Sequence, residues 1–261
     1  MIVPSMSNLE IFDALFADRE KLQIKAKSLI PKMAKQFKKE GKFPAWRWEE
    51  YTHQKSHNRY LICFYAPTLS KSDNPEIHFL AFMDEDRQRI VIQWGCWIYQ
   101  IHGSMEAIAT RYIGYFSGHF FSRYRERIWK DVEITYNELL CRYFSRNIST
   151  VPIKLNKDIQ RNYKEYGELA QYAFEVPEGT CFIRQWNEGD ESTIGEKDSD
   201  FISVVLYYTF VNRGMMSETQ NEAIKKESTR YIRDYYKSLF EDAMKEAFVR
   251  RLNTQSQKHL K

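Results

Sequence analysis

The sequence lacks the marks of several large protein classes. Its four cysteines, Cys63, Cys96, Cys141 and Cys181, stand far apart and form no CxxC pair, so buried, reduced thiols are the simplest interpretation. No stretch approaches the roughly 18 consecutive apolar residues of a membrane-spanning helix. The first residues also lack the basic start and apolar run of an export signal. We therefore expect a soluble, cytoplasmic protein that does not associate with membranes.

Motifs for metal and nucleotide chemistry are missing as well. There is no HExxH, no Cys/His quartet, no GxGxxG, no P-loop and no GxSxG, and each of these patterns supplies ligands or reactive groups at a required spacing. His53 and His57 in HQKSH have a spacing that would chelate a metal across one helical turn, but no third ligand accompanies them. We expect no metal and no cofactor.

The charge is distributed unevenly. The chain has 261 residues, of which 43% are hydrophobic and 15% aromatic, enough for the core of one large or two small domains. A net charge of +4 is too mild to indicate nucleic-acid binding by itself. Residues 20–42, however, hold eight lysines against two glutamates. Such a face is typical of a solvated helix, and contact with phosphates, through Lys35 and Lys38 among others, is the alternative.

Hydrophobic spacing predicts a helix followed by strands in the first half of the chain. Apolar residues recur at helical intervals over 7–40, where Ser7 or Asn8 can cap the helix and Pro31 must break or kink it. The period then changes. Short segments rich in β-branched and aromatic residues, separated by turn residues, predict antiparallel strands at 59–68, 76–83 and 89–99.

The second half repeats this order. A helical block is expected over 118–146, interrupted near Lys130 and Asp131. YAFEV and CFIRQW flank PEGT, which predicts a hairpin, and residues 201–211 form the most strand-like segment of the chain. Ser217 and Gln220 have the spacing of a capping box, so a last helix should begin at SETQ.

Segregation of strands from helices favours an α+β fold. We expect one or more antiparallel sheets with the helices on one side, and long helices at both ends. A boundary near residues 100–117 would separate a region of unknown role, 1–110, from a region at 111–261. One fused domain is the alternative, in which the first strands extend the same core.

The segment GHFFSRYRERIWKD, residues 118–131, carries the clearest chemical signal. His119, Arg123 and Arg127 recur every four residues, so each lies only about 40° further round a helix than the last. A histidine can accept and donate a proton near neutral pH. Arginine binds phosphate oxygens through paired hydrogen bonds. Together they suit metal-free RNA cleavage, in which the 2′-hydroxyl attacks the phosphate and a 2′,3′-cyclic phosphate forms.

A resemblance strengthens this hypothesis. HFFSRYRERI, preceded by Tyr115 and Ser117 and followed by a hairpin and a strand ending LYYTFVNRGMMSETQ, resembles the barnase, EndoU, colicin and RelE-like superfamily of metal-independent nucleases over roughly residues 112–222. The resemblance implies that His119, Arg123 and Arg127 act from the helix. Thr209 or Tyr208 would then supply a polar group from the strand. Apart from the resemblance, Arg125 of the same segment is a further candidate for binding the substrate.

Two interpretations remain at this stage. The first is a metal-independent endoribonuclease. The second is a non-catalytic binding protein, such as an accessory of a mobile element or a toxin system, that docks RNA, other nucleic acid or an acidic protein through its basic helix faces. Against both functions stands a purely structural alternative, in which His119 hydrogen-bonds to a nearby loop and the arginines form an ordinary solvated surface. The sequence does not indicate an oligomeric state.

Overall fold

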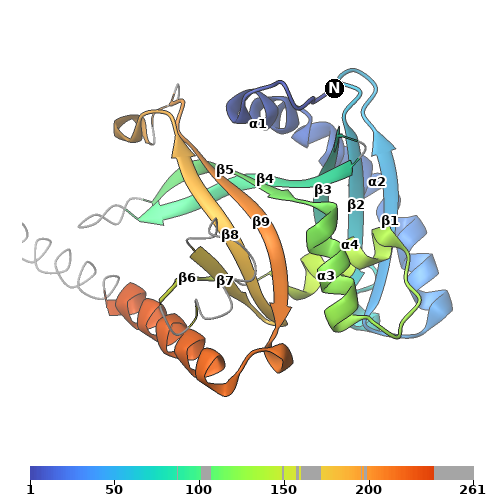
Figure 1. Ribbon diagram of the computed structural model, residues 1–261. Coiled ribbons are helices and arrows are strands. Elements are labelled where there is room, and N and C mark those ends of the chain that lie inside the picture. The colour runs from blue at the N-terminus through green and yellow to red at the C-terminus, as the bar shows by residue number, and fades with distance from the viewer. Residues whose placement is uncertain are drawn as a thin grey trace, which may run out of the picture.

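The computed structural model describes residues 1–86, 88–100, 107–148, 150–156, 159, 172–194, 196 and 199–237 (Figure 1). Its helices are α1 (Asn8–Ala17), α2 (Arg19–Glu40), α3 (Gly118–Ile128) and α4 (Tyr136–Arg146), and residues 218–237 are also helical. Its strands are β1 (Ala45–Thr52), β2 (Arg59–Ala66), β3 (Glu76–Glu85), β4 (Gln88–Gln100), β5 (Ala107–Phe116), β6 (Val151–Lys154), β7 (Tyr172–Val176), β8 (Gly179–Glu188) and β9 (Ile202–Asn212).

The strands form one mixed sheet, in the order β1-β2-β3-β4-β5-β9-β8-β7-β6. Seven of the neighbouring pairs are antiparallel, and β5 and β9 are parallel. The α+β class is therefore confirmed, but the expectation of a purely antiparallel sheet was wrong. Parallel neighbours need a long crossover connection, and here α3, α4 and the strands β6 to β8 supply it.

Helices cover both faces of the sheet, which corrects the expectation that they lie on one side. In β2, Leu61 and Cys63 pack with α3 and α4, whereas Tyr60 and Ile62 pack against α1 and α2. Accordingly, α1 lies above β4 and β5 in Figure 1, while α3 lies below them. A strand covered on both faces is apolar throughout, and this is why YLICF in β2 shows no alternation with polar residues.

The long N-terminal helix is divided, but not at the expected residue. Ser7, one of the two expected caps, caps α1, and it also forms a capping box with Glu10. The break falls at Asp18, so the segment consists of a helix of 10 residues followed by one of 22 residues. Pro31 lies inside α2 and does not end it. Proline removes one backbone hydrogen bond, and the buried contacts of Leu29, Met33 and Phe37 on either side hold the helix together.

Later local predictions agree with the structure. α3 and α4 are separated at residues 129–135, β7 and β8 form the hairpin that PEGT indicated, and Ser217 and Gln220 bond each other's backbone N–H groups at 3.3 and 3.0 Å. The part of the last helix expected beyond residue 237 lies outside the described residues.

The largest core lies between α3, α4 and the face of the sheet that they cover. Its centre is a cluster of aromatic rings in which Phe116 of β5 and Tyr207 of β9 stack with centroids 3.8 Å apart. Phe120 and Phe121 of α3 pack edge-on against Tyr143 of α4. Edge-to-face pairs are a favourable arrangement for such rings, so much of the aromatic content of the chain is used in folding.

Candidate functional site

The predicted basic helix exists, and its orientation follows from its apolar residues. Ser117 caps α3 by accepting a hydrogen bond from the Phe120 backbone at 3.2 Å. Phe120, Phe121 and Tyr124 are fully buried, which turns the opposite side of the helix outward. His119 is exposed, and Arg123 and Arg127 are half-buried. Arg125, six residues after His119, lies about 120° away from it round the helix.

Both arginines of the predicted site already have partners. Arg123 donates to the Glu126 carboxylate at 2.8 Å. Arg127 donates to the backbone carbonyl of Phe210 in β9, and Asn212 donates back to the Arg127 carbonyl at 2.8 Å. Arg127 thus fastens α3 to the end of β9. An incoming phosphate would compete with these contacts for both guanidinium groups.

The structure does not bring Thr209 or Tyr208 to this helix. The pairing of β8 with β9 shifts between Phe182↔Thr209 and Ile183↔Tyr207, so β9 has a bulge at Tyr208. Directly paired side chains share a face, and Phe182 packs away from α3, beside the helix that follows β9. Thr209 therefore lies on the far side of the sheet from His119, and it is only 4% exposed. Its hydroxyl has no hydrogen-bond partner among the described residues.

The lysines of α2 form a second basic surface. At 100° per residue, Lys21, Lys32, Lys35 and Lys39 fall within about 60° of one another, and we call these four residues the lysine stripe. All four are exposed. Lys32 pairs with Glu49 at 3.0 Å, whereas the other three form no ion pair with a described residue.

Lys38 differs from Lys35, although the sequence suggested the same role for both. It lies outside the lysine stripe and pairs with Asp73 at 2.6 Å. The structure therefore brings Lys35 together with other uncompensated lysines, and it places Lys38 in a surface ion pair. Such exposed pairs contribute little to stability.

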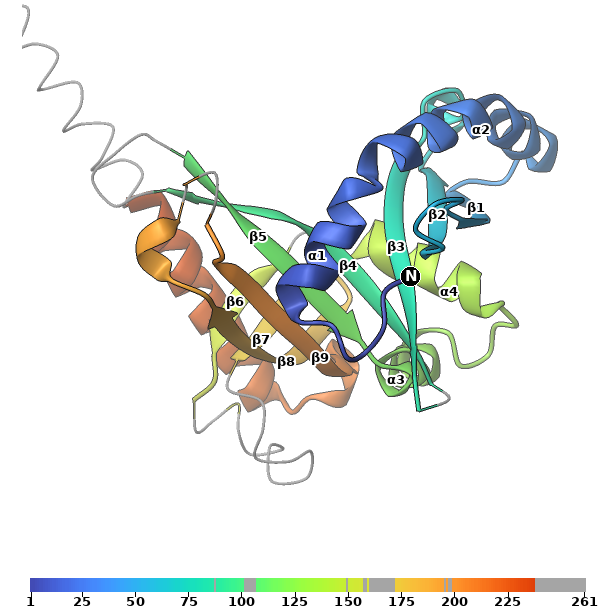
Figure 2. The ribbon, with the colours of Figure 1, turned by 90° about the horizontal axis from the view of Figure 1, so that it is seen from above.

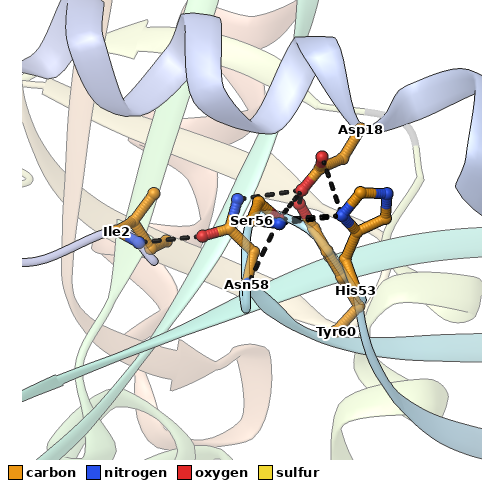
Figure 3. A network of polar contacts seen from close by, with 6 residues as sticks. All are labelled: Ile2, Asp18, His53, Ser56, Asn58 and Tyr60. Atoms are coloured by element: carbon orange, nitrogen blue, oxygen red, sulfur yellow. Dashed lines mark hydrogen bonds and ion pairs between the residues drawn. The ribbon is translucent and has the colours of Figure 1, made fainter.

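A polar network at the junction of α1 and α2 was missed by the sequence reasoning (Figure 3). Asp18 is 5% exposed and accepts hydrogen bonds from Ser56 at 2.6 Å, Asn58 at 2.9 Å and Tyr60 at 2.6 Å. Its other carboxylate oxygen lies 3.2 Å from Nδ1 of His53. These contacts join the helix break to the turn between β1 and β2.

Serine, histidine and aspartate meet in this network, but not as a nucleophilic triad. A triad uses the two ring nitrogens separately, one for the serine and one for the acid. Here Ser56 Oγ lies 3.0 Å from His53 Nδ1, the same nitrogen that faces Asp18, and it donates its proton to Asp18. The arrangement fits a structural role, in which the network holds the α1–α2 junction against the turn between β1 and β2. His53 and His57 lie in a hairpin turn, with φ of 57° at His57, and not on the helical turn considered for a metal.

Hydrogen bonding keeps Asp18 ionised. Burial alone would raise the pKa of Asp18, but the donors Ser56, Tyr60 and Asn58 outweigh it and lower this pKa below its ordinary value. Burial and the neighbouring Asp18 carboxylate raise the pKa of Tyr60. Local sequence signals did not locate this junction. Asp18 directly precedes α2, where aspartate is a favoured capping residue, but its side chain makes no capping hydrogen bond and is used by the network instead.

Neither a metal site nor a membrane-spanning helix is found in the part of the chain that the structure describes. Among the described residues, no three histidine, cysteine, aspartate or glutamate side chains are placed to hold a metal ion. Within the same part of the chain, each helix is too short or too polar to cross a membrane. Comparison of the chain with protein-family models, curated proteins and solved structures gave no significant match.

Proposed function

We propose that the protein is a non-catalytic binding protein that docks single-stranded nucleic acid along the lysine stripe of α2. One observation carries the proposal: Lys21, Lys35 and Lys39 are exposed on one line of a 22-residue helix and form no ion pair with a described residue. Lysines in this state can exchange their counterions for phosphates, and the release of counterions drives binding.

The length of the stripe suits a polymer better than a small anion. A rise of 1.5 Å per residue places Lys21 and Lys39 about 27 Å apart along the helix. Several phosphates of one strand fit within that length. Leu22, Leu29 and Phe37 anchor the other side of α2 in the core, so the lysines are held on a rigid element and little backbone order has to be gained on binding.

The state of α3 supports binding over catalysis. Arg123 and Arg127 are engaged by Glu126 and by the Phe210 carbonyl. Thr209, the predicted strand residue, lies on the other side of the sheet from His119. A metal-independent ribonuclease is the second candidate, and one observation favours it: His119 is exposed one helical turn before Arg123.

Salt dependence tests the binding proposal. We expect labelled single-stranded RNA and DNA to bind with a log–log salt slope of about −2, because each of the three stripe lysines that form no ion pair with a described residue contributes about −0.7 on single strands. The double variant Lys35→Gln/Lys39→Gln should reduce that slope by about 1.4 and weaken binding about tenfold at low salt. Lys130→Gln/Lys225→Gln, which removes two exposed lysines from elsewhere, should bind as the native protein does. Equal losses in both variants would overturn the assignment to the stripe.

An RNA cleavage assay distinguishes the binding protein from the ribonuclease. Intact RNA after incubation with the native protein in EDTA supports the non-catalytic function. Fragments with 2′,3′-cyclic phosphate ends that disappear in His119→Ala would instead establish the ribonuclease, whatever the affinity of the stripe.

A further inference from the structure

The sheet splits open between β3 and β4. Their pairing runs only from Glu85↔Gln88 to Ala81↔Ile92. Beyond these residues β3 stays with β2 as far as Glu76, and β4 stays with β5. Figure 2 shows the two strands diverging from their shared hairpin, with α1 and the start of α2 on one side of the opening.

A cavity of about 580 Å³ occupies this split. We call it the β3–β4 cleft. Phe79 and Trp94 line it from the two strands, Phe16 and Arg19 from the α1–α2 junction, and Phe144 from α4 on the opposite face of the sheet. Phe16 keeps 45% of its surface exposed. Apolar and aromatic walls with a few polar groups, in a volume of this size, are typical of a small-molecule site.

Gly95 of β4 lines the cleft and has no packing reason to be glycine. A Cβ built at this position meets nothing within 4 Å. Glycine inside a strand weakens the strand, and it often marks a place where a ligand approaches the backbone. The same open space makes Gly95 a position where a larger side chain can fill the cleft without a clash at Cβ.

Two polar groups of the cleft have no hydrogen-bond or ion-pair partner among the described residues. Arg19 forms no ion pair with a described residue and holds its guanidinium carbon 5.7 Å from the Phe16 ring centre. His78 Nε2 is buried without a hydrogen-bond partner among the described residues. Burial also lowers the pKa of His78, which favours the neutral ring. A buried nitrogen without a partner is costly unless a ligand or water satisfies it.

We propose that the β3–β4 cleft binds a small organic anion with a flat apolar body. The rings Phe16, Phe79 and Trp94 would contact the body, and Arg19 would pair with a carboxylate or a sulfonate at the rim. His78 supplies a hydrogen bond inside the cleft. This site is independent of the lysine stripe, because none of the four stripe lysines lines the cleft.

Anilinonaphthalene sulfonate (ANS) is a suitable probe, since it joins flat rings to a sulfonate. We expect one ANS molecule to bind per chain with enhanced fluorescence. Gly95→Leu, which fills the cleft, should weaken binding at least about tenfold, and Arg19→Gln by about tenfold. N-phenylnaphthylamine has the same rings without the sulfonate, so it should bind more weakly and be insensitive to Arg19→Gln.

Matched controls exclude indirect effects. Gly118→Leu adds a side chain at another glycine with open space around its Cβ, and Lys55→Gln removes an exposed cation away from the cleft; both should bind ANS as the native protein does. Near-UV circular dichroism and thermal melting identify any variant that fails to fold, because loosely packed states also bind ANS. If Gly95→Leu does not fold, weaker ANS binding by Arg19→Gln and by Phe16→Ala, which changes an exposed residue, tests the site instead. Absent or multiple ANS binding, or equal affinity in native protein and cleft variants, overturns the site.

Discussion

Replacing Asp18 with alanine should destabilise the protein more than almost any other single change at a charged residue. The carboxylate is 5% exposed and accepts three hydrogen bonds of 2.6 to 2.9 Å. Two of its donors, Asn58 and Tyr60, are each only 1% exposed, so Asp18→Ala leaves their buried polar atoms without a hydrogen-bond acceptor. Each buried group left unsatisfied in this way costs about 1–3 kcal/mol. We therefore expect the free energy of unfolding to fall by about 3–5 kcal/mol.

Urea unfolding, followed by circular dichroism at pH 7, measures this loss. The midpoint should fall while the slope with urea stays unchanged, because the native fold is retained. Asp73→Ala is the matched control: it removes an aspartate whose side chain is 69% exposed and which pairs only with Lys38 among the described residues. It should change stability by less than about 1 kcal/mol. An Asp18→Ala loss as small as that of the control would refute the reasoning.

The pH dependence provides an independent check of the same residue. The pKa of Asp18 is lower in the folded protein than its ordinary value of 3.8, so its ionised form stabilises the fold at pH values above that value. This stabilisation disappears as the pH falls through the folded pKa. The difference in stability between native protein and Asp18→Ala should therefore be largest near neutral pH and shrink below about pH 4. A difference that grew on acidification would contradict a charge-stabilised network.

Three smaller predictions follow from single contacts. Arg127→Ala should lower stability by about 1–2 kcal/mol in urea unfolding, because it removes the bond from α3 to the Phe210 carbonyl. Pro31→Ala should raise stability by about 1–3 kcal/mol, since Pro31 is exposed inside α2 and costs a helical hydrogen bond; a loss would contradict this. A thiol reagent should modify Cys96 alone in the native protein and all four cysteines in urea, because the other three are buried, and burial raises the pKa of Cys181 to about 12.

Features that depend on neighbouring residues were predictable from the sequence. The capping pairs Ser7–Glu10 and Ser217–Gln220, the β7–β8 hairpin and the amphipathic helix α3 all arise from contacts within a few residues. Such contacts are encoded by type and spacing alone. The same holds for the basic face of α2, whose lysines are exposed because its apolar residues point to the core.

Features that depend on long-range pairing were not predictable. Strict alternation along β9 would turn Thr209 to the same face as Tyr207, toward α3. The bulge at Tyr208 reverses it, and a bulge arises from how β8 and β9 register against each other, which no local pattern in YYTFV reveals. The Asp18 network joins residues about 40 positions apart in the chain, so only the docking of the β1–β2 turn on the helix break makes it visible.

The burial of both sheet faces restricts where this protein can bind anything. Strands β2, β5 and β9 have α1 or α2 on one side and α3 or α4 on the other, and their side chains are committed to cores. Around this part of the sheet, side chains that bind a partner must then lie on the outer sides of the helices or at a break in the sheet. α2 takes part in both: its first turn supplies Arg19 to the β3–β4 cleft, and its exposed side carries the lysine stripe. Because different residues of the helix face the two sites, Arg19→Gln and Lys35→Gln/Lys39→Gln should each impair one kind of binding and leave the other intact.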